Sequence, residues 1–126
     1  MKKVLVDSSV WIAFFKGENK SLPLIELIDS NLVCVNDLIL AELIPAMYHR
    51  KEWHLIELFS EIECIEMRIN WPDIIDLQKK NLSAGINNVG IPDLIIAQNA
   101  IYHQVPLYTF DKHFQLMSKN FNLTLF

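Results

Sequence analysis

Apolar residues gather in short continuous runs that alternate with stretches of helical spacing. The runs Val4–Val6 and Leu32–Val35 are rich in β-branched residues, which is typical of strands buried on both faces of a parallel sheet. Between them, a helix is expected to begin at Ser8 or Ser9 and to close at Gly17, and a second helix follows it. This order of strand, helix, helix and strand predicts an α/β fold.

The same pattern continues to the end of the chain. Asn36 or Asp37 begins a predicted helix, and the alternation over Cys64–Ile69 predicts a half-exposed strand near a sheet edge. The other predicted elements are a helix over Trp53–Ile62, one from Asn70 to about Gly85, one from Pro92 to about His103, a strand over Val105–Phe110, a short helix with Phe114 and Met117, and a last strand with Phe121, Leu123 and Leu125. We expect a mostly parallel sheet with helices on both faces.

Composition limits the class of protein. The 126 residues suit one domain spanning 1–126, and 52% hydrophobic residues exclude a disordered chain. Eleven Lys and Arg against fifteen Asp and Glu give a net charge of −4, so nucleic-acid binding would need local basic patches or a bound metal. The basic start Met1–Lys3 resembles a signal peptide only in its charge, and we expect a soluble cytoplasmic protein. Cys34 and Cys64 are expected to be reduced, buried thiols.

Two aspartates end predicted strands. Asp7 follows the first strand and Asp111 follows the strand over Val105–Phe110. Ligands of open α/β sheets bind at the carboxyl ends of strands, which makes both aspartates candidates for a functional site. The alternative is that each caps the helix that follows it.

Two further acids have competing explanations. Asp93 falls in the first turn of its helix, where the helix dipole favours a carboxylate. Glu42 lies in an apolar stretch of helix, where an unpaired charge is costly, and a salt bridge to Arg50 or Lys51 is the structural alternative.

The four acids could converge on one pocket. Carboxylates about 5 Å apart repel by roughly 3 kcal/mol per pair at an effective dielectric constant near 20, so such a cluster needs a cation or shared protons. Carboxylate oxygens favour Mg²⁺ or Mn²⁺. A metal held in this way can activate water for hydrolysis of a phosphodiester.

Four stretches, in order, resemble the PIN-domain nucleases, and among them the VapC-like toxins of type II toxin-antitoxin systems. The resemblance implies a PIN-like three-layer α/β/α sandwich with a mostly parallel central sheet. It covers nearly the whole chain and rests on Val4–Ser9, Ala41–Leu43, Gly90–Ala97 and Thr109–Phe114.

The resemblance also implies a function. It makes the chain an Mg²⁺-dependent endoribonuclease, with Mn²⁺ as a substitute, that cuts RNA, forms a homodimer and is neutralised by a cognate antitoxin. The implied metal ligands are Asp7, Asp93 and Asp111, with Glu42 orienting metal or water. The implied supporting hydroxyls are those of Ser9 and Thr109.

The chain departs from the family in one place. Many members carry another acid just after the last aspartate, where this chain has Lys112 and His113. We expect His113 to contact an RNA phosphate instead, and Lys112, Arg50 and Lys51 to guide the RNA backbone locally.

Two other functions stay open at this point. One is a receiver-like signalling module of flavodoxin-like fold, which binds Mg²⁺ at strand ends. Such a module should carry two adjacent acidic residues after the first strand. This chain has Asp7-Ser8-Ser9 there. The other is a catalytically inactive protein-interaction domain whose acids bind a basic partner. Nucleotide-binding, serine-hydrolase and HExxH zinc motifs are absent from the sequence.

Overall fold

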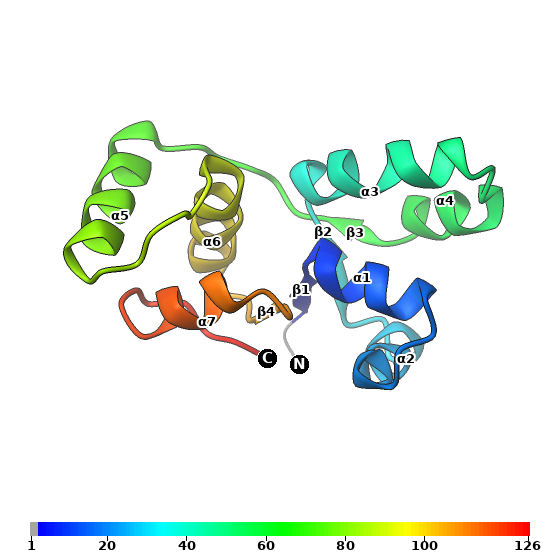
Figure 1. Ribbon diagram of the computed structural model, residues 1–126. Coiled ribbons are helices and arrows are strands. Elements are labelled where there is room, and N and C mark those ends of the chain that lie inside the picture. Colours follow the sequence, from blue (N-terminus) through cyan, green and yellow to red (C-terminus); the bar gives the residue numbers. More distant parts are fainter. Residues whose placement is uncertain (1–2) are drawn as a thin grey trace.

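A computed structural model describes residues 3–126, in which four parallel strands form one sheet with the order β3-β2-β1-β4 (Figure 1). Met1 and Lys2, part of the basic start, lie outside the described residues. Because β1 is central, its carboxyl end lies between those of two neighbouring strands. The strands are β1 (Val4–Val6), β2 (Val33–Val35), β3 (Glu63–Cys64) and β4 (Leu107–Tyr108).

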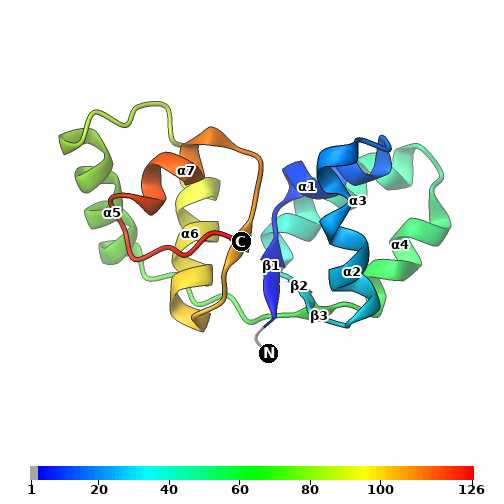
Figure 2. The same ribbon diagram turned by 90° about the horizontal axis from the view of Figure 1, so that it is seen from below.

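Helices cover both faces of the sheet, which confirms the predicted α/β layers (Figures 1 and 2). The chain runs outward from β1 to β2 to β3 and then crosses back to β4. Because such crossovers are right-handed, the helices before β3 and those after it lie on opposite faces. The first set is α1 (Ser8–Phe15), α2 (Pro23–Asp29), α3 (Asp37–His49) and α4 (Trp53–Ser60), with a short 3₁₀ turn η1 (Asn19–Ser21); the second set is α5 (Trp71–Ser83), α6 (Ile91–His103) and α7 (Lys112–Ser118).

Local sequence explains where several helices begin and end. The Asn36 side chain accepts a hydrogen bond of 2.9 Å from the Ile39 amide, so Asn36 rather than Asp37 caps α3. Asn70 caps α5 in the same way, with a bond of 3.1 Å from the Asp73 amide. Gly17, with φ of +73°, ends the segment after α1 in the left-handed conformation that favours glycine.

Two predicted strands are shorter than expected. The strand over Cys64–Ile69 is reduced to β3, because β2 ends at Val35 and the Ile65 amide makes the last bond to it, at 2.8 Å. The strand over Val105–Phe110 is reduced to β4, because the Phe110 amide bonds to the Ser9 side chain and not to a neighbouring strand.

The predicted C-terminal strand is wrong as an independent element. Only Leu125 pairs with the sheet, through an isolated parallel bridge to Leu107. The Leu107 amide donates to the Thr124 carbonyl, and the Phe126 amide donates to the Leu107 carbonyl, both at 2.9 Å. The end of the chain therefore lies along the outer side of β4.

The strand residues and one face of each helix form the hydrophobic core. Trp11 of α1 is fully buried and packs edge-on against Phe59 of α4, with 4.7 Å between ring centroids. Both cysteines are free, as predicted, but only Cys34 is buried; Cys64 is exposed at the sheet edge. In the part of the chain from residue 3 onward, no helix is long and apolar enough to cross a membrane.

Candidate metal and active site

Asp7 immediately follows β1 and is 4% exposed. Its carboxylate oxygen Oδ2 accepts hydrogen bonds from the hydroxyls of Ser9 (2.8 Å) and Thr109 (3.0 Å). Asp7 occupies the position before α1, yet its side chain makes no capping bond to that helix. A capping role therefore does not account for this buried carboxylate. Both hydroxyls bond to Oδ2, so neither of them occupies the Oδ1 oxygen.

The two hydroxyls also fix the bend after β4. The Thr109 oxygen accepts a bond of 3.1 Å from the Asp111 amide, and the Ser9 oxygen accepts one of 3.1 Å from the Phe110 amide. Because β1 and β4 are neighbours in the sheet, this set of bonds joins their carboxyl ends. The side chain of Asp111 is thereby carried to the same edge of the sheet as Asp7.

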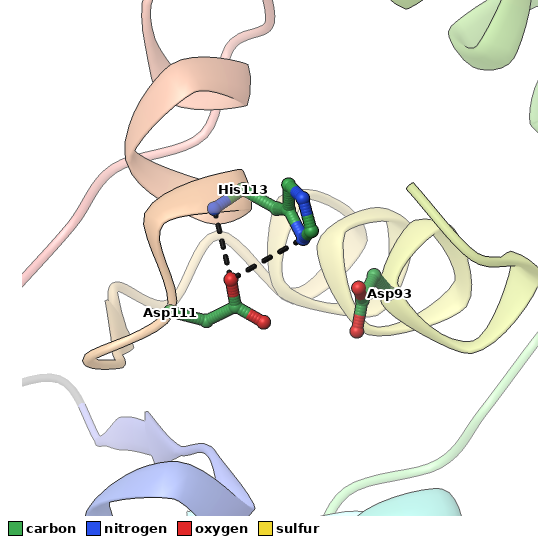
Figure 3. Close-up of side chains that lie close together, drawn as sticks. All are labelled: Asp93, Asp111 and His113. Atoms are coloured by element: carbon green, nitrogen blue, oxygen red, sulfur yellow. Dashed lines mark hydrogen bonds and ion pairs between the residues drawn. The ribbon is translucent and has the colours of Figure 1, made fainter. Parts of the chain in front are cut away.

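Asp111 has two visible roles at the start of α7. Its Oδ1 oxygen accepts a bond of 2.9 Å from the His113 amide, so Asp111 does cap this helix. The same oxygen lies 3.4 Å from Nδ1 of the His113 ring, as Figure 3 shows. The cap holds the ring of His113 beside the carboxylate.

Asp93 completes a close cluster. It lies in the first turn of α6 and faces Asp111 and His113 across the gap between α6 and α7 (Figure 3). One donor atom from each of the three side chains lies within 4.8 Å of the other two. Burial first, and then the negative charges of Asp111 and Asp7, raise the pKa of Asp93 above its ordinary value, while His113 lowers it.

Glu42 occupies a different environment from the one the sequence suggested. Helix α3 buries Ile39, Leu43 and Met47, and Glu42 lies on its exposed side. It takes part in no ion pair within residues 3–126, so the salt bridge to Arg50 or Lys51, the structural alternative for this residue, is not formed.

The acidic site nevertheless acts on Glu42. Partial burial raises the pKa of Glu42, and the charges of Asp7 and Asp93 raise it further, while a hydrogen bond with Ser8 lowers it. Glu42 therefore belongs to the same electrostatic environment as the aspartates, although it lies outside the close cluster.

The basic candidates are divided between two places. Lys112 is the exposed first residue of α7, directly after Asp111. Arg50 lines a cavity of about 190 Å³ together with Glu42, between α1 and α3. Lys51 follows with φ of +59° and is not among the residues that line this cavity.

One feature of the site escaped the sequence analysis. The Asn36 amide group donates to the Asn99 side-chain oxygen at 2.8 Å, and the Asn99 amide group donates to the Glu66 carbonyl at 2.9 Å. Both asparagines are buried. They connect the start of α3, which carries Glu42, with α6, which carries Asp93. Two polar residues in the otherwise apolar run Leu94–Ile101 were the signal for this bridge.

The donor set suits a divalent cation. Carboxylate oxygens are the ligands that Mg²⁺ and Mn²⁺ prefer, and crowded negative charges that disfavour ionisation are relieved when a cation binds. Asp93 and Asp111 supply such oxygens within the close cluster. The buried Asp7 lies outside that cluster, but its charge acts on Asp93 and makes it a third candidate ligand. The structure thus offers a candidate acidic metal site at the carboxyl ends of β1 and β4.

Comparison with known proteins gives the same fold over the whole chain. The structure is similar to DNA-bound VapBC from Salmonella typhimurium (TM-score 0.77, 19% identity, covering 100% of this chain and 98% of that chain). It is also similar to VapBC2 from Rickettsia felis bound to a promoter DNA fragment (TM-score 0.74, 21% identity, 98% and 96% covered). A toxin-antitoxin complex from Klebsiella pneumoniae is a third match (TM-score 0.60, 17% identity, 87% and 88% covered).

Sequence comparison assigns the family. Among curated protein sequences no match was found. The PIN domain, however, matches residues 4–120, which include every candidate acid of the site. The resemblance read from the sequence is therefore confirmed, and the chain belongs to the PIN domain family of nucleases.

Proposed function

We propose that this protein is an Mg²⁺-dependent endoribonuclease that acts as the toxin of a toxin-antitoxin pair. The observation that carries the proposal is the convergence of Asp93, Asp111 and His113 within 4.8 Å beside the buried Asp7. Likeness to VapBC complexes in fold supports the assignment to toxins.

In this proposal each acidic residue has a distinct task. Asp7, Asp93 and Asp111 hold the cation, which when bound supplies charge neutralisation and an acidified water for attack on phosphorus. Ser9 and Thr109 hold the Asp7 carboxylate in place through Oδ2. Glu42 lies at the rim and, with its raised pKa, is suited to accept a proton from the attacking water.

Local positive charge guides the RNA, because the chain as a whole carries −4. Lys112 is exposed next to Asp111 and is placed to contact a phosphate near the cleaved bond. Arg50 and Lys51 follow α3 and extend this path past Glu42. Their contribution is electrostatic and is expected to weaken as salt rises.

In this proposal the protein acts in the cytoplasm and binds two partners, an antitoxin and a second copy of the chain. The cavity beside Glu42 combines apolar side chains with the charged Lys16, Glu42, Arg50 and Glu52, which suits an amphipathic antitoxin segment, and an arginine of that segment would pair with the acids. The lining residues used in this argument are Ile12, Phe15, Leu43, Ala46 and Met47. Exposed aromatic residues, including Tyr48 and Trp53, are surfaces available for self-association.

Of the other functions, the receiver-like module has lost its support, because the family is assigned and Asp7 has no acidic neighbour. An RNA cleavage experiment distinguishes the nuclease from the inactive interaction domain. We would incubate a mixed RNA pool with wild type, Asp7→Asn and the remote control Asp29→Asn, in Mg²⁺, Mn²⁺ or EDTA. Cuts that need metal, persist in the control and vanish in Asp7→Asn are expected.

The ends of the products add a second criterion. Hydrolysis by a metal-activated water leaves 5′-phosphate ends, whereas a metal-independent ribonuclease that uses the RNA 2′-hydroxyl leaves cyclic phosphate ends. Cleavage that is equal in wild type and Asp7→Asn, or that survives EDTA, would contradict the proposal. Metal binding without any cleavage across the pool would instead favour the inactive interaction domain.

A further inference from the structure

The ring of His113 lies where a metal ligand would lie. Its Nδ1 atom is 3.4 Å from Oδ1 of Asp111. One ring nitrogen of His113, one carboxylate oxygen of Asp111 and one of Asp93 all lie within 4.8 Å of one another. Two donors bound about 2.1 Å from one ion at tetrahedral or octahedral angles are themselves roughly 3.0–3.4 Å apart. The pair formed by His113 and Asp111 therefore meets this requirement as it stands.

The backbone keeps the ring in this place. His113 is the second residue of α7, and its amide donates to Asp111, so the helix cap fixes the distance between the two residues. The ring is about one-third exposed, at 36%, and no carboxylate other than Asp111 pairs with it within residues 3–126. The ring is therefore open to solvent on one side and has no second carboxylate partner, within the described residues, that would compete with an ion.

We propose that His113 is a nitrogen ligand of the metal and makes the site selective for a divalent first-row transition ion, such as Mn²⁺, over Mg²⁺. The inference rests on the proposed function, because it concerns the same cation. Mg²⁺ prefers oxygen donors throughout, whereas imidazole is a good ligand of transition ions. Replacing one oxygen donor by imidazole shifts the preference of the site away from Mg²⁺.

The competing explanation is an ordinary ion pair, in which the positively charged His113 ring pairs with the Asp111 carboxylate and never contacts the metal. The two explanations predict different metal affinities for a variant in which His113 is replaced. If the ring is a ligand, a carboxylate at this position raises the affinity for Mg²⁺ more than the affinity for Mn²⁺, so the ratio of Mn²⁺ to Mg²⁺ affinity falls. If it is only a pair, His113→Asp adds a fourth acid and increases the affinity for both ions together.

The test measures binding without RNA. We would titrate Mg²⁺ and Mn²⁺ into wild type, His113→Asp, His113→Gln and the exposed control His54→Gln by calorimetry near neutral pH. The ratio of Mn²⁺ to Mg²⁺ affinity is expected to fall by about 10-fold in His113→Asp and to stay unchanged in the control. In His113→Gln the Mn²⁺ affinity is expected to fall by a similar factor.

A spectroscopic measurement reads the ligand itself. Pulsed electron paramagnetic resonance of one Mn²⁺ per chain is expected to show coupling to an imidazole ¹⁴N nucleus in wild type and His54→Gln, and none in His113→Gln. Mn²⁺ binding without this coupling in wild type would overturn the inference and leave the proposed nuclease intact. Failure of wild type to bind either ion would overturn both.

Discussion

Thr109 and Asp7 are 102 residues apart in the chain and share a hydrogen bond of 3.0 Å. The Thr109 hydroxyl donates to the carboxylate and at the same time accepts from the Asp111 amide. A single oxygen atom thus sets the distance between two acids of the site. Its removal should affect the site more than its small volume suggests.

We expect Thr109→Val to lower the free energy of unfolding by about 1–2 kcal/mol, because the Asp111 amide loses its acceptor and the Asp7 carboxylate keeps only the bond from Ser9. RNA cleavage should fall by about 10-fold, as for a residue that orients a metal ligand. Chemical denaturation and initial cleavage rates measure the two effects. Thr109→Ser should retain both properties, and the exposed Thr124→Val is the control; equal behaviour of Thr109→Val and Thr124→Val would contradict the role of the hydroxyl.

Removing the Asp93 charge should stabilise the metal-free protein. The pKa of Asp93 is raised by burial and by Asp111 and Asp7, so ionisation costs stability as pH rises through the folded pKa. In EDTA at neutral pH, Asp93→Asn is expected to melt about 2–4 °C above wild type. The gain should disappear below about pH 3, where the carboxyl is protonated in both the folded and the unfolded states.

The order should reverse when metal is added. At ten times its dissociation constant, Mg²⁺ stabilises wild type by about 1.4 kcal/mol, and Asp93→Asn less. Thermal melts with and without Mg²⁺ measure this difference, with Glu57→Gln on α4 as an exposed control. An Asp93→Asn protein that melts below wild type in EDTA would show that the helix-dipole benefit of this carboxylate outweighs the repulsion.

The buried asparagine bridge makes a separate prediction. Asn99→Ala removes the acceptor of the Asn36 amide group and leaves the Glu66 carbonyl bonded to His103 alone. We expect a loss of about 1–3 kcal/mol in the free energy of unfolding, measured in urea. Asn87→Ala, in the exposed loop before α6, should change it by less than about 0.5 kcal/mol. Similar values for the two variants would contradict the bridge.

Two glycines near α6 should respond differently to alanine. Gly85 has φ of +76°, where a side chain is strained, whereas Gly90 has φ of −79°. A Cβ atom on Gly90 would lie 3.5 Å from the Pro92 ring, which is ordinary contact. Gly85→Ala is therefore expected to destabilise the protein by about 1 kcal/mol more than Gly90→Ala in thermal or urea unfolding. Equal effects would mean that the turn after α5 tolerates another conformation.

Sequence periodicity predicted the layers and most helix starts, because these depend on neighbouring residues. Asn70 illustrates this, since its cap needs only the Asp73 amide three positions on. The length of the edge strand after Cys64 did not follow, because it depends on where β2 ends. Beyond that point the segment instead meets α6, where Asn99 and His103 both bond to the Glu66 carbonyl.

In the candidate site, too, some features follow from the sequence and others depend on packing between distant elements. The rule for parallel sheets was enough to bring Asp7 and Asp111 to one edge. The closeness of Asp93 and His113 depends on how α6 and α7 pack, which no local pattern encodes. The sequence predicted an apolar environment for Glu42 because its neighbours along the chain are apolar. In α3, however, Glu42 lies on a different side of the helix from the buried Ile39 and Leu43.

The two edges of the sheet are unequally protected. Beyond β4, residues Thr124–Phe126 already occupy the outward amide and carbonyl of Leu107. A further chain therefore cannot extend the sheet there, and the edge next to Thr109 and Asp111 is guarded against intermolecular strand pairing and aggregation. At the opposite edge, β3 is two residues long and exposed, so its shortness is what limits strand addition. Any partner that reaches the acids must do so through side chains rather than by completing the sheet.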